Sequence, residues 1–182
     1  MSGGHGAGAH SENKSVALVI SILALLLAIA EILGQKAQTQ TLQSNIEASN
    51  LWSFFQAKTI RRTIADTAAD EMDTMLVGVI NEAQKKAMSD RIARFRSTAQ
   101  RMESEPETKE GRKELMARAL AAEKVRDKAG IKHYRFELAS GSFQIAIVVA
   151  SAAVITGIGA MLWGAGGLAA IGLFLLMAGL LA

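Results

Sequence analysis

Charged residues are confined to the middle of this 182-residue chain, and this segregation limits its possible folds more than any other feature. All but one of the 20 Lys and Arg lie between Lys36 and Arg135, and all but two of the 17 Asp and Glu lie between Glu47 and Glu137. The flanks are almost entirely apolar. The flanks are therefore candidate membrane segments, and the middle is a separate charged domain.

Three apolar runs in the flanks have the length that a membrane-spanning helix needs. Residues 16–34 contain one charge, Glu31, whereas residues 142–163 and 165–182 contain none. About 20 apolar residues cross the ~30 Å hydrocarbon layer of a bilayer as a helix. We predict three transmembrane helices at these positions, with the Gly-rich residues 163–167 as the turn between the second and the third.

The first run has an alternative interpretation as a cleaved signal peptide. Ala28-Ile29-Ala30 forms an A-x-A pattern behind an apolar stretch, as at a signal-peptidase site. The run is long for the apolar region of a signal peptide, however, and Lys14 is the only basic residue before it. We expect a retained helix, preceded by a flexible Gly/His-rich tail over residues 1–15.

Basic residues near the membrane runs predict the orientation. The turn that follows the second run has no basic residue. Five basic residues precede that run, namely Lys124, Arg126, Lys128, Lys132 and Arg135. The positive-inside rule then places residues 35–141 and the C-terminus in the cytoplasm, and the N-terminus on the other side of the membrane.

The charged middle is predicted to be helical, because apolar residues recur at spacings of three and four along it. The two stripes are Ile60, Ile64, Ala68, Met72, Met75 and Val79, followed by Ile92, Phe95, Ala99 and Met102. Gly78 is the first candidate break. Residues 104–107 resemble a capping box, which predicts a third helix from there to Gly130. A short amphipathic piece, residues 131–139, then leads into the membrane.

The lengths of these helices predict an antiparallel hairpin. Residues 35–77 would extend about 65 Å and the two return helices about 74 Å, so both arms can begin and end at the membrane. The expected fold class is an all-α integral membrane protein with three transmembrane helices and a long helical-hairpin or coiled-coil cytoplasmic domain. A hairpin two helices thick buries only a narrow stripe. We therefore expect a homo-oligomer or a fixed subunit of a membrane complex.

Trp52, Phe54 and Phe55 form the leading candidate for a partner-binding site. Three aromatic residues within four positions of a helix cannot share one face. One interpretation places Phe55 or Trp52 in the core of the hairpin. The other leaves at least one ring exposed as an anchor for a partner, since aromatic side chains contribute much of the energy of protein interfaces. The sequence leaves both open.

The membrane runs carry two further candidates. Glu31, about one turn from the inner end of its run, could bind a proton or cation or pair with a neighbouring subunit. Alternatively, it is an interfacial carboxylate that reaches the lipid headgroups. Small residues four apart allow close packing of membrane helices and occur at Ala153, Gly157, Ala160 and Gly164.

Residue types that support catalysis or metal binding are sparse. Cysteine is absent, and two of the three histidines, His5 and His10, lie in the tail. The helical face that carries Asp66, Asp70 and Asp73 cannot surround an ion by itself. The arginines of residues 91–101 alternate with acidic residues and lack the aromatic neighbours of a nucleic-acid site. We expect no enzymatic activity, no cofactor, no metal and no nucleic-acid partner.

Four stretches of the chain resemble a bacterial membrane-protein family known only as a domain of unknown function. They are NKSVAL at 13–18, ASNLWSFFQAK at 48–58, KEGRKEL at 109–115 and QIAIV at 144–148. They cover nearly the whole chain in the expected order. The resemblance implies three membrane helices with a coiled middle. It implies no activity. We expect a bacterial inner membrane protein, and the basic residues described above then predict a periplasmic N-terminus.

The leading functional hypothesis is a non-enzymatic scaffold or accessory subunit. Its partners would be the lipid bilayer and either copies of itself or subunits of a larger membrane complex. The alternative is a small oligomeric channel or transporter with a pathway near Glu31. The near absence of polar residues in the last two runs disfavours a wet pore.

Overall fold

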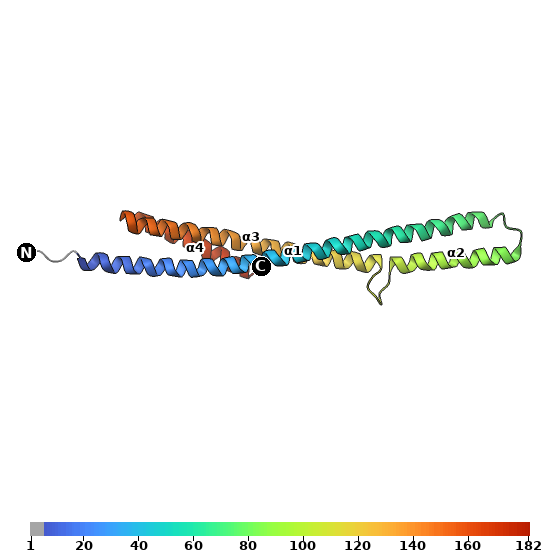
Figure 1. The fold of residues 1–182 in the computed structure, drawn as a ribbon, viewed down its shortest axis with the longest axis horizontal. Helices are drawn as coiled ribbons and strands as arrows, with labels where there is room; N and C mark the ends of the chain where they lie inside the picture. Colours follow the sequence, from blue (N-terminus) through green and yellow to red (C-terminus); the bar gives the residue numbers. More distant parts are fainter. Residues whose placement is uncertain (1–5) are drawn as a thin grey trace, which may run out of the picture. The chain divides into compact units, whose positions relative to one another are not determined.

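The structure is a computed structural model that describes the backbone of residues 6–182 and the side chains from Lys14 onward. Four helices follow one another along the chain (Figure 1): α1 (Gly6–Leu76), α2 (Glu82–Glu103), α3 (Arg112–Thr156) and α4 (Ala160–Leu180). The described residues contain no strand. The prediction of an all-helical fold is confirmed.

The helices form two compact units. The terminal unit comprises Met1–Leu42 and Arg126–Ala182, and the middle unit comprises Gln43–Val125. Helices α1 and α3 each contribute to both, because neither is interrupted where the units meet. The first apolar run therefore continues directly into the charged middle, and the break predicted at Gly130 is absent.

In the terminal unit, α1, α3 and α4 pack around a core that repeats along the helices. Buried residues recur every seven positions on α1, at Leu23, Ala30 and Ala37, and on α3, at Phe136 and Phe143. A seven-residue recurrence of buried positions is the pattern of coiled coils. The core of this unit is therefore a coiled-coil seam to which α4 adds Leu176.

Two glycines of α4 leave room for two aromatic rings of α3, which pack directly against them. A Cβ built on Gly172 would lie 2.8 Å from the Phe143 ring, and one on Gly179 would lie 2.6 Å from the Phe136 ring. Both distances are shorter than normal van der Waals contact, so a side chain at either position would force the helices apart. The close approach of α3 and α4 therefore depends on Gly172 and Gly179, which lie seven residues apart in α4.

The small residues predicted from the sequence to pack membrane helices together do not form this close contact. Ala153 is buried, but Gly164 has no atom near the position of a Cβ, and Gly157 and Ala160 are exposed. The prediction relied on the four-residue spacing of small residues in the sequence. In the structure, the small residues needed for close packing are the glycines that lie opposite the rings of Phe136 and Phe143.

The connection between α3 and α4 lies earlier than predicted. Residues 157–159 form it, and the glycines of residues 163–167 lie inside α4. Gly157 adopts a left-handed backbone with φ of 69°, and its N–H donates to the carbonyl of Ala153 over 2.9 Å. This is a common helix-ending motif, which favours glycine at the left-handed position. The predicted turn at 163–167 was wrong.

In the middle unit, α1 packs against α2 and the first part of α3. Ala48 and Leu51 of α1 form a core with Leu115, Ala119 and Ala122 of α3. Further along α1, Asp73 pairs with Arg96 of α2 over 2.9 Å. These contacts form the antiparallel hairpin with a broken return arm that the helix lengths predicted.

The breaks in this hairpin fall at two places. Helix α1 ends at Leu76, beside the predicted break at Gly78, and Asn81 caps α2 by accepting hydrogen bonds from two backbone N–H groups. The predicted start of a third helix at residues 104–107 was wrong, because Ser104 ends α2 and α3 begins only at Arg112. The Ser104 hydroxyl donates to Glu114 over 2.6 Å instead of capping a helix.

The N-terminal tail also differs from expectation. Helix α1 begins at Gly6, so the backbone of residues 6–15 is helical where a flexible tail was predicted. His5 lies outside the described residues, as does the side chain of His10.

Candidate partner-binding surface of the middle unit

The three clustered aromatic residues separate into two environments. Trp52 and Phe55 are half-buried and pack on the core of Ala48, Leu51 and the α3 residues, with their rings edge to face at a centroid distance of 5.4 Å. Phe54 lies outside this core and is 40% exposed. The structure therefore places Trp52 and Phe55 in the hairpin and leaves Phe54 accessible.

A hydrogen bond to α3 holds Trp52 in place. Its indole Nε1 donates to the Glu123 carboxylate over 3.0 Å. A half-buried Trp usually needs a partner for its single donor, and a charged acceptor makes the stronger kind of bond. Trp52 is therefore positioned as a structural residue of the hairpin.

An ionic network lies beside the aromatic residues where α2 gives way to α3. Glu103 accepts from Arg62 over 2.9 Å and from Arg112 over 2.7 Å. The Arg112 guanidinium also stands 5.0 Å from the centre of the Phe55 ring. One carboxylate at the end of α2 thus joins α1 to the start of α3.

Lys58 is a buried charge beside this network, and sequence reasoning missed it. It is 6% exposed, and its ammonium lies 3.4 Å from Glu105 and 5.8 Å from the centre of the Phe54 ring. It occupies an inner position of α1, seven residues after Leu51 and seven before Ala65. A heptad count of α1 would have placed Lys58 inward, which is the signal that could have found it.

The loop between α2 and α3 is held tightly. A Cβ on Gly111 would overlap the backbone at Ser104 and Glu105, so glycine is required there. Glu114 accepts from the Ser104 hydroxyl over 2.6 Å and from the Glu105 N–H over 3.2 Å. The bond from Ser104 is the main reason that the pKa of Glu114 lies below its ordinary value.

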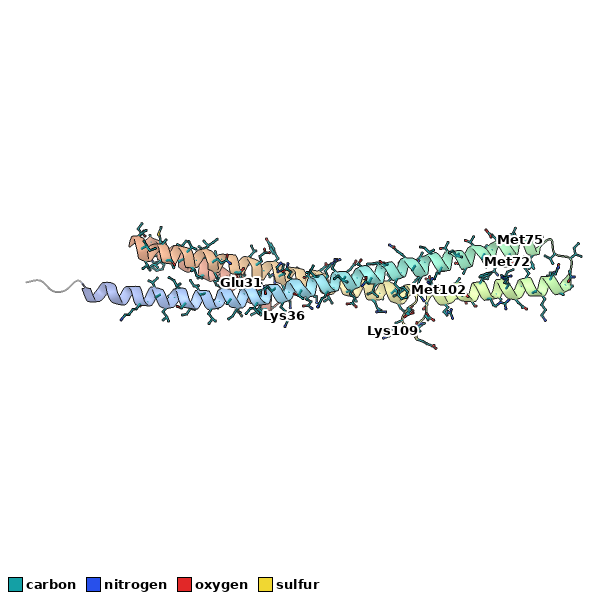
Figure 2. All side chains as sticks on the ribbon, viewed as in Figure 1. Glu31, Lys36, Met72, Met75, Met102 and Lys109 are labelled. Atoms are coloured by element: carbon teal, nitrogen blue, oxygen red, sulfur yellow. The ribbon has the colours of Figure 1, made fainter. Side chains whose placement is uncertain are left out.

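Helix α1 presents small residues inward and large apolar residues outward. Ala48, Ala65 and Ala69 are buried, whereas Ile60 and Ile64 are 61% and 63% exposed. Within the middle unit, the exposed large apolar residues of α1 that lie close to one line along the helix are Ile46, Ile60, Ile64 and Met75. We call these four residues the outer stripe; Met75 is labelled near the end of α1 in Figure 2.

The predicted packing face of α1 therefore has to be corrected. The stripe that begins with Ile60 and Ile64 was expected to pack inside the hairpin, but its largest members face away from the core. Alanine at the inner positions allows the helices to approach closely. Sequence reasoning chose the bulkier residues, although the alanines fit the closely spaced helices.

An open groove lies next to the outer stripe. It is lined by Phe54 and Ile46 together with polar and apolar neighbours: Gln43, Glu47, Asn50, Leu51 and Arg118. Apolar surface with charged groups at its margin is typical of protein-binding surfaces. The groove and the outer stripe form one candidate partner-binding surface of the middle unit.

Glu31 has a partner that sequence reasoning missed. The amide of Gln144 on α3 donates to its carboxylate over 3.2 Å, and both side chains are exposed in the terminal unit. Glu31 is labelled in Figure 2. The pair supplies a polar contact between two apolar helices.

Two of the three aspartates on the predicted acidic face of α1 form ion pairs. Asp66 lies 3.3 Å from Arg62, and Asp73 lies 2.9 Å from Arg96. Among the described residues, no group of three or more His, Cys, Asp or Glu side chains could hold a metal ion.

Over the part of the chain that the structure describes, the fold is all-helical, and three helices, α1, α3 and α4, are long and apolar enough to cross a membrane. The chain belongs to the family described as domain of unknown function DUF4337, whose model matches residues 12–182. This confirms the resemblance to a family of unknown function. No curated protein and no solved structure matches the chain.

Proposed function

We propose that the protein is a non-enzymatic scaffold of the bacterial inner membrane that associates with copies of itself through the middle unit. The outer stripe of α1 is the observation that carries this proposal, because one copy alone leaves its large apolar side chains in water. The middle unit would lie in the cytoplasm, with the three apolar helix segments in the bilayer.

The positions of two exposed aromatic residues support membrane anchoring. Because Phe136 packs on Gly179, Tyr134 is level with the end of α4, whereas Trp163 lies in its first turn. About 27 Å of helix separates these levels, which is close to the ~30 Å thickness of the hydrocarbon layer. Tyr and Trp are typical of the two membrane–water interfaces.

The energy available at the outer stripe favours a partner. Burying one Ile or Met side chain fully contributes roughly 1.5–3 kcal/mol, so the four residues could supply about 6–12 kcal/mol. Association itself costs an estimated ~4–15 kcal/mol. The stripe therefore needs a further anchor for stable assembly, and Phe54 in the adjacent groove is suited to that role.

A second copy of the chain is the occupant that fits best. Copies inserted in one bilayer have the same orientation, and α1 runs unbroken from the terminal unit into the middle unit. Each copy would present the same outer-stripe residue at the same distance along α1 from its membrane segment. Confinement to the bilayer also raises the effective concentration of neighbouring copies.

The test is a pair of substitutions that add the same charge on different helices of the middle unit. Ile64→Glu places a carboxylate in the outer stripe of α1, whereas Gln84→Glu places one at an exposed position of α2. We expect Ile64→Glu to shift full-length protein in lipid nanodiscs or mild detergent from oligomer to monomer, with Gln84→Glu unchanged. Circular dichroism checks that helix content is retained. A monomeric native protein, or an oligomer that persists in Ile64→Glu, would contradict the proposal.

A channel near Glu31 is the second candidate, and the Gln144–Glu31 hydrogen bond favours it. A polar pair facing outward from apolar helices could line a path between copies. Under this proposal, Glu31→Gln abolishes ion flux into protein-containing liposomes. Absence of flux in the native protein would exclude it.

A further inference from the structure

Three basic residues of α3 share one face of the terminal unit. Lys128, Lys132 and Arg135 follow one another at spacings of four and three residues. Residues at these spacings lie one above another on the surface of a helix. They form a positive stripe, which we call the basic stripe.

The basic stripe begins where α4 ends. The Arg135 guanidinium donates to the carbonyl of Ala178 over 2.6 Å, and α4 ends two residues later at Leu180. Carbonyls in the last turn of a helix lack partners within it and carry partial negative charge, which accounts for this contact. Lys132 and Lys128 lie about 4.5 and 10.5 Å further along α3 from Arg135, too far along to serve the same helix end.

The two lysines are free to bind a ligand. Neither forms a hydrogen bond or an ion pair among the described residues, and Lys128 is exposed. Of the two neighbouring carboxylates, Asp127 pairs with Arg126 over 2.9 Å, and Glu137 lies beside His133. Neither carboxylate lies on the basic stripe, so its charge is not neutralised from within the stripe.

We propose that the basic stripe binds the headgroups of anionic phospholipids at the cytoplasmic surface of the bilayer. This inference rests on the proposed membrane anchoring. Tyr134, an exposed neighbour of Arg135, is at the level expected for the membrane–water interface. Basic residues next to a membrane helix attract anionic lipid, each by about fivefold in affinity. Two free lysines would therefore favour an anionic over a zwitterionic lipid by roughly 25-fold.

The experiment compares two double variants that remove the same charge. Lys128→Gln with Lys132→Gln removes the free lysines of the basic stripe, whereas Lys109→Gln with Lys113→Gln removes two exposed lysines of the middle unit. Full-length proteins are reconstituted in vesicles of phosphatidylcholine with a minor fraction of phosphatidylglycerol. Native mass spectrometry after mild solubilisation then measures the lipids that remain bound.

We expect native protein and the Lys109/Lys113 variant to retain phosphatidylglycerol selectively, and the Lys128/Lys132 variant to lose that selectivity. Equal selectivity in all three proteins, or none in the native protein, would overturn the inference. Displacement of the lipid by an equal concentration of inorganic phosphate would also overturn it. Extraction of the same vesicles with alkaline carbonate separates the two proposals, because release of the native protein contradicts membrane anchoring itself.

Discussion

The ring of Phe143 on α3 lies against Gly172 on α4 so closely that a Cβ on the glycine would stand 2.8 Å from a ring carbon. Phe143 is fully buried, so its ring has little freedom to move aside. This contact and the equivalent one between Phe136 and Gly179 determine how closely the two helices approach. They also provide the sharpest test of the packing.

Gly172→Ala should destabilise the terminal unit by about 1–3 kcal/mol, the usual cost of overpacking a core. The matched control is Gly166→Ala in the same helix, where no atom lies within 4 Å of the position of a Cβ. That change should be neutral or stabilising, because alanine favours a helix over glycine. Denaturation of the purified proteins in detergent, followed by circular dichroism, measures both. Equal stability of the two variants would contradict the close contact.

Phe54→Ala and Phe55→Ala should affect different properties. Loss of an exposed anchor such as Phe54 can cost about 2 kcal/mol of binding, which is near thirtyfold in affinity. Phe55 is half-buried, so its loss should lower the free energy of unfolding by roughly 2–3 kcal/mol, less than the ~3–5 kcal/mol of a fully buried Phe. Oligomer dissociation on dilution and thermal unfolding distinguish them. A Phe54→Ala protein that assembles normally would exclude this residue as an anchor.

Glu114 should make the stability of the protein depend on pH in the acid range. Its folded-state pKa lies below the ordinary value of 4.5, chiefly because the Ser104 hydroxyl donates to it. The folded state therefore binds a proton more weakly than the unfolded state does. The resulting stability is present above about pH 4.5 and is lost as the pH falls through the folded pKa.

Glu114→Gln removes this contribution, so the native protein should exceed the variant in stability at neutral pH and approach it in acid. Thermal unfolding at both pH values measures the difference. Glu110→Gln, in the loop before α3, serves as the control and should follow the native profile. A constant difference between native protein and Glu114→Gln across the range would count against the role of this carboxylate.

The orientation can be tested with single cysteines, because the chain has none of its own. Glu107→Cys lies in the loop between α2 and α3, and Ile158→Cys lies in the turn between α3 and α4. With the middle unit in the cytoplasm, an impermeant thiol reagent should label Ile158→Cys in intact cells and reach Glu107→Cys only after permeabilisation. The reverse pattern would invert the orientation.

The helical architecture could be predicted because its signals are strong and local. Long apolar runs without charge, the near absence of proline and the break beside Gly78 sufficed for the helices and the hairpin. The inward face of α1 was missed, because alanine is compatible with either face and the apolar side chains chosen for their size lie outward. The large side chains of Ile60 and Ile64 favoured a prediction that they face the core. In the structure the helices are closely spaced, and the small residues Ala65 and Ala69 occupy the inner positions instead.

The first and last residues of α3 were predicted wrongly, because the same short sequence motif can occur in more than one structural setting. Residues 104–107 match a capping box, but Ser104 serves the end of α2 and Glu114 instead. Glycine occurs both in the α3–α4 connection and in the first turns of α4, and only the left-handed backbone of Gly157 shows which one ends the helix. The partners of Lys58 and Glu31 lie in other parts of the chain, far away in the sequence. The pattern of residues within one helix cannot predict such contacts.

The seven-residue spacing along α1 has a consequence for how this chain can change in length. Leu51, Lys58 and Ala65 repeat the inner face every seven residues, and Ile46 and Ile60 repeat the outer stripe at twice that interval. Inserting one residue between them would rotate everything beyond it by about 100°, so that the inner residues beyond the insertion would turn out of the core. Inserting seven, with matching residues in the return arm, would preserve both faces. Natural variants of this protein should therefore lengthen or shorten the arm in steps of seven.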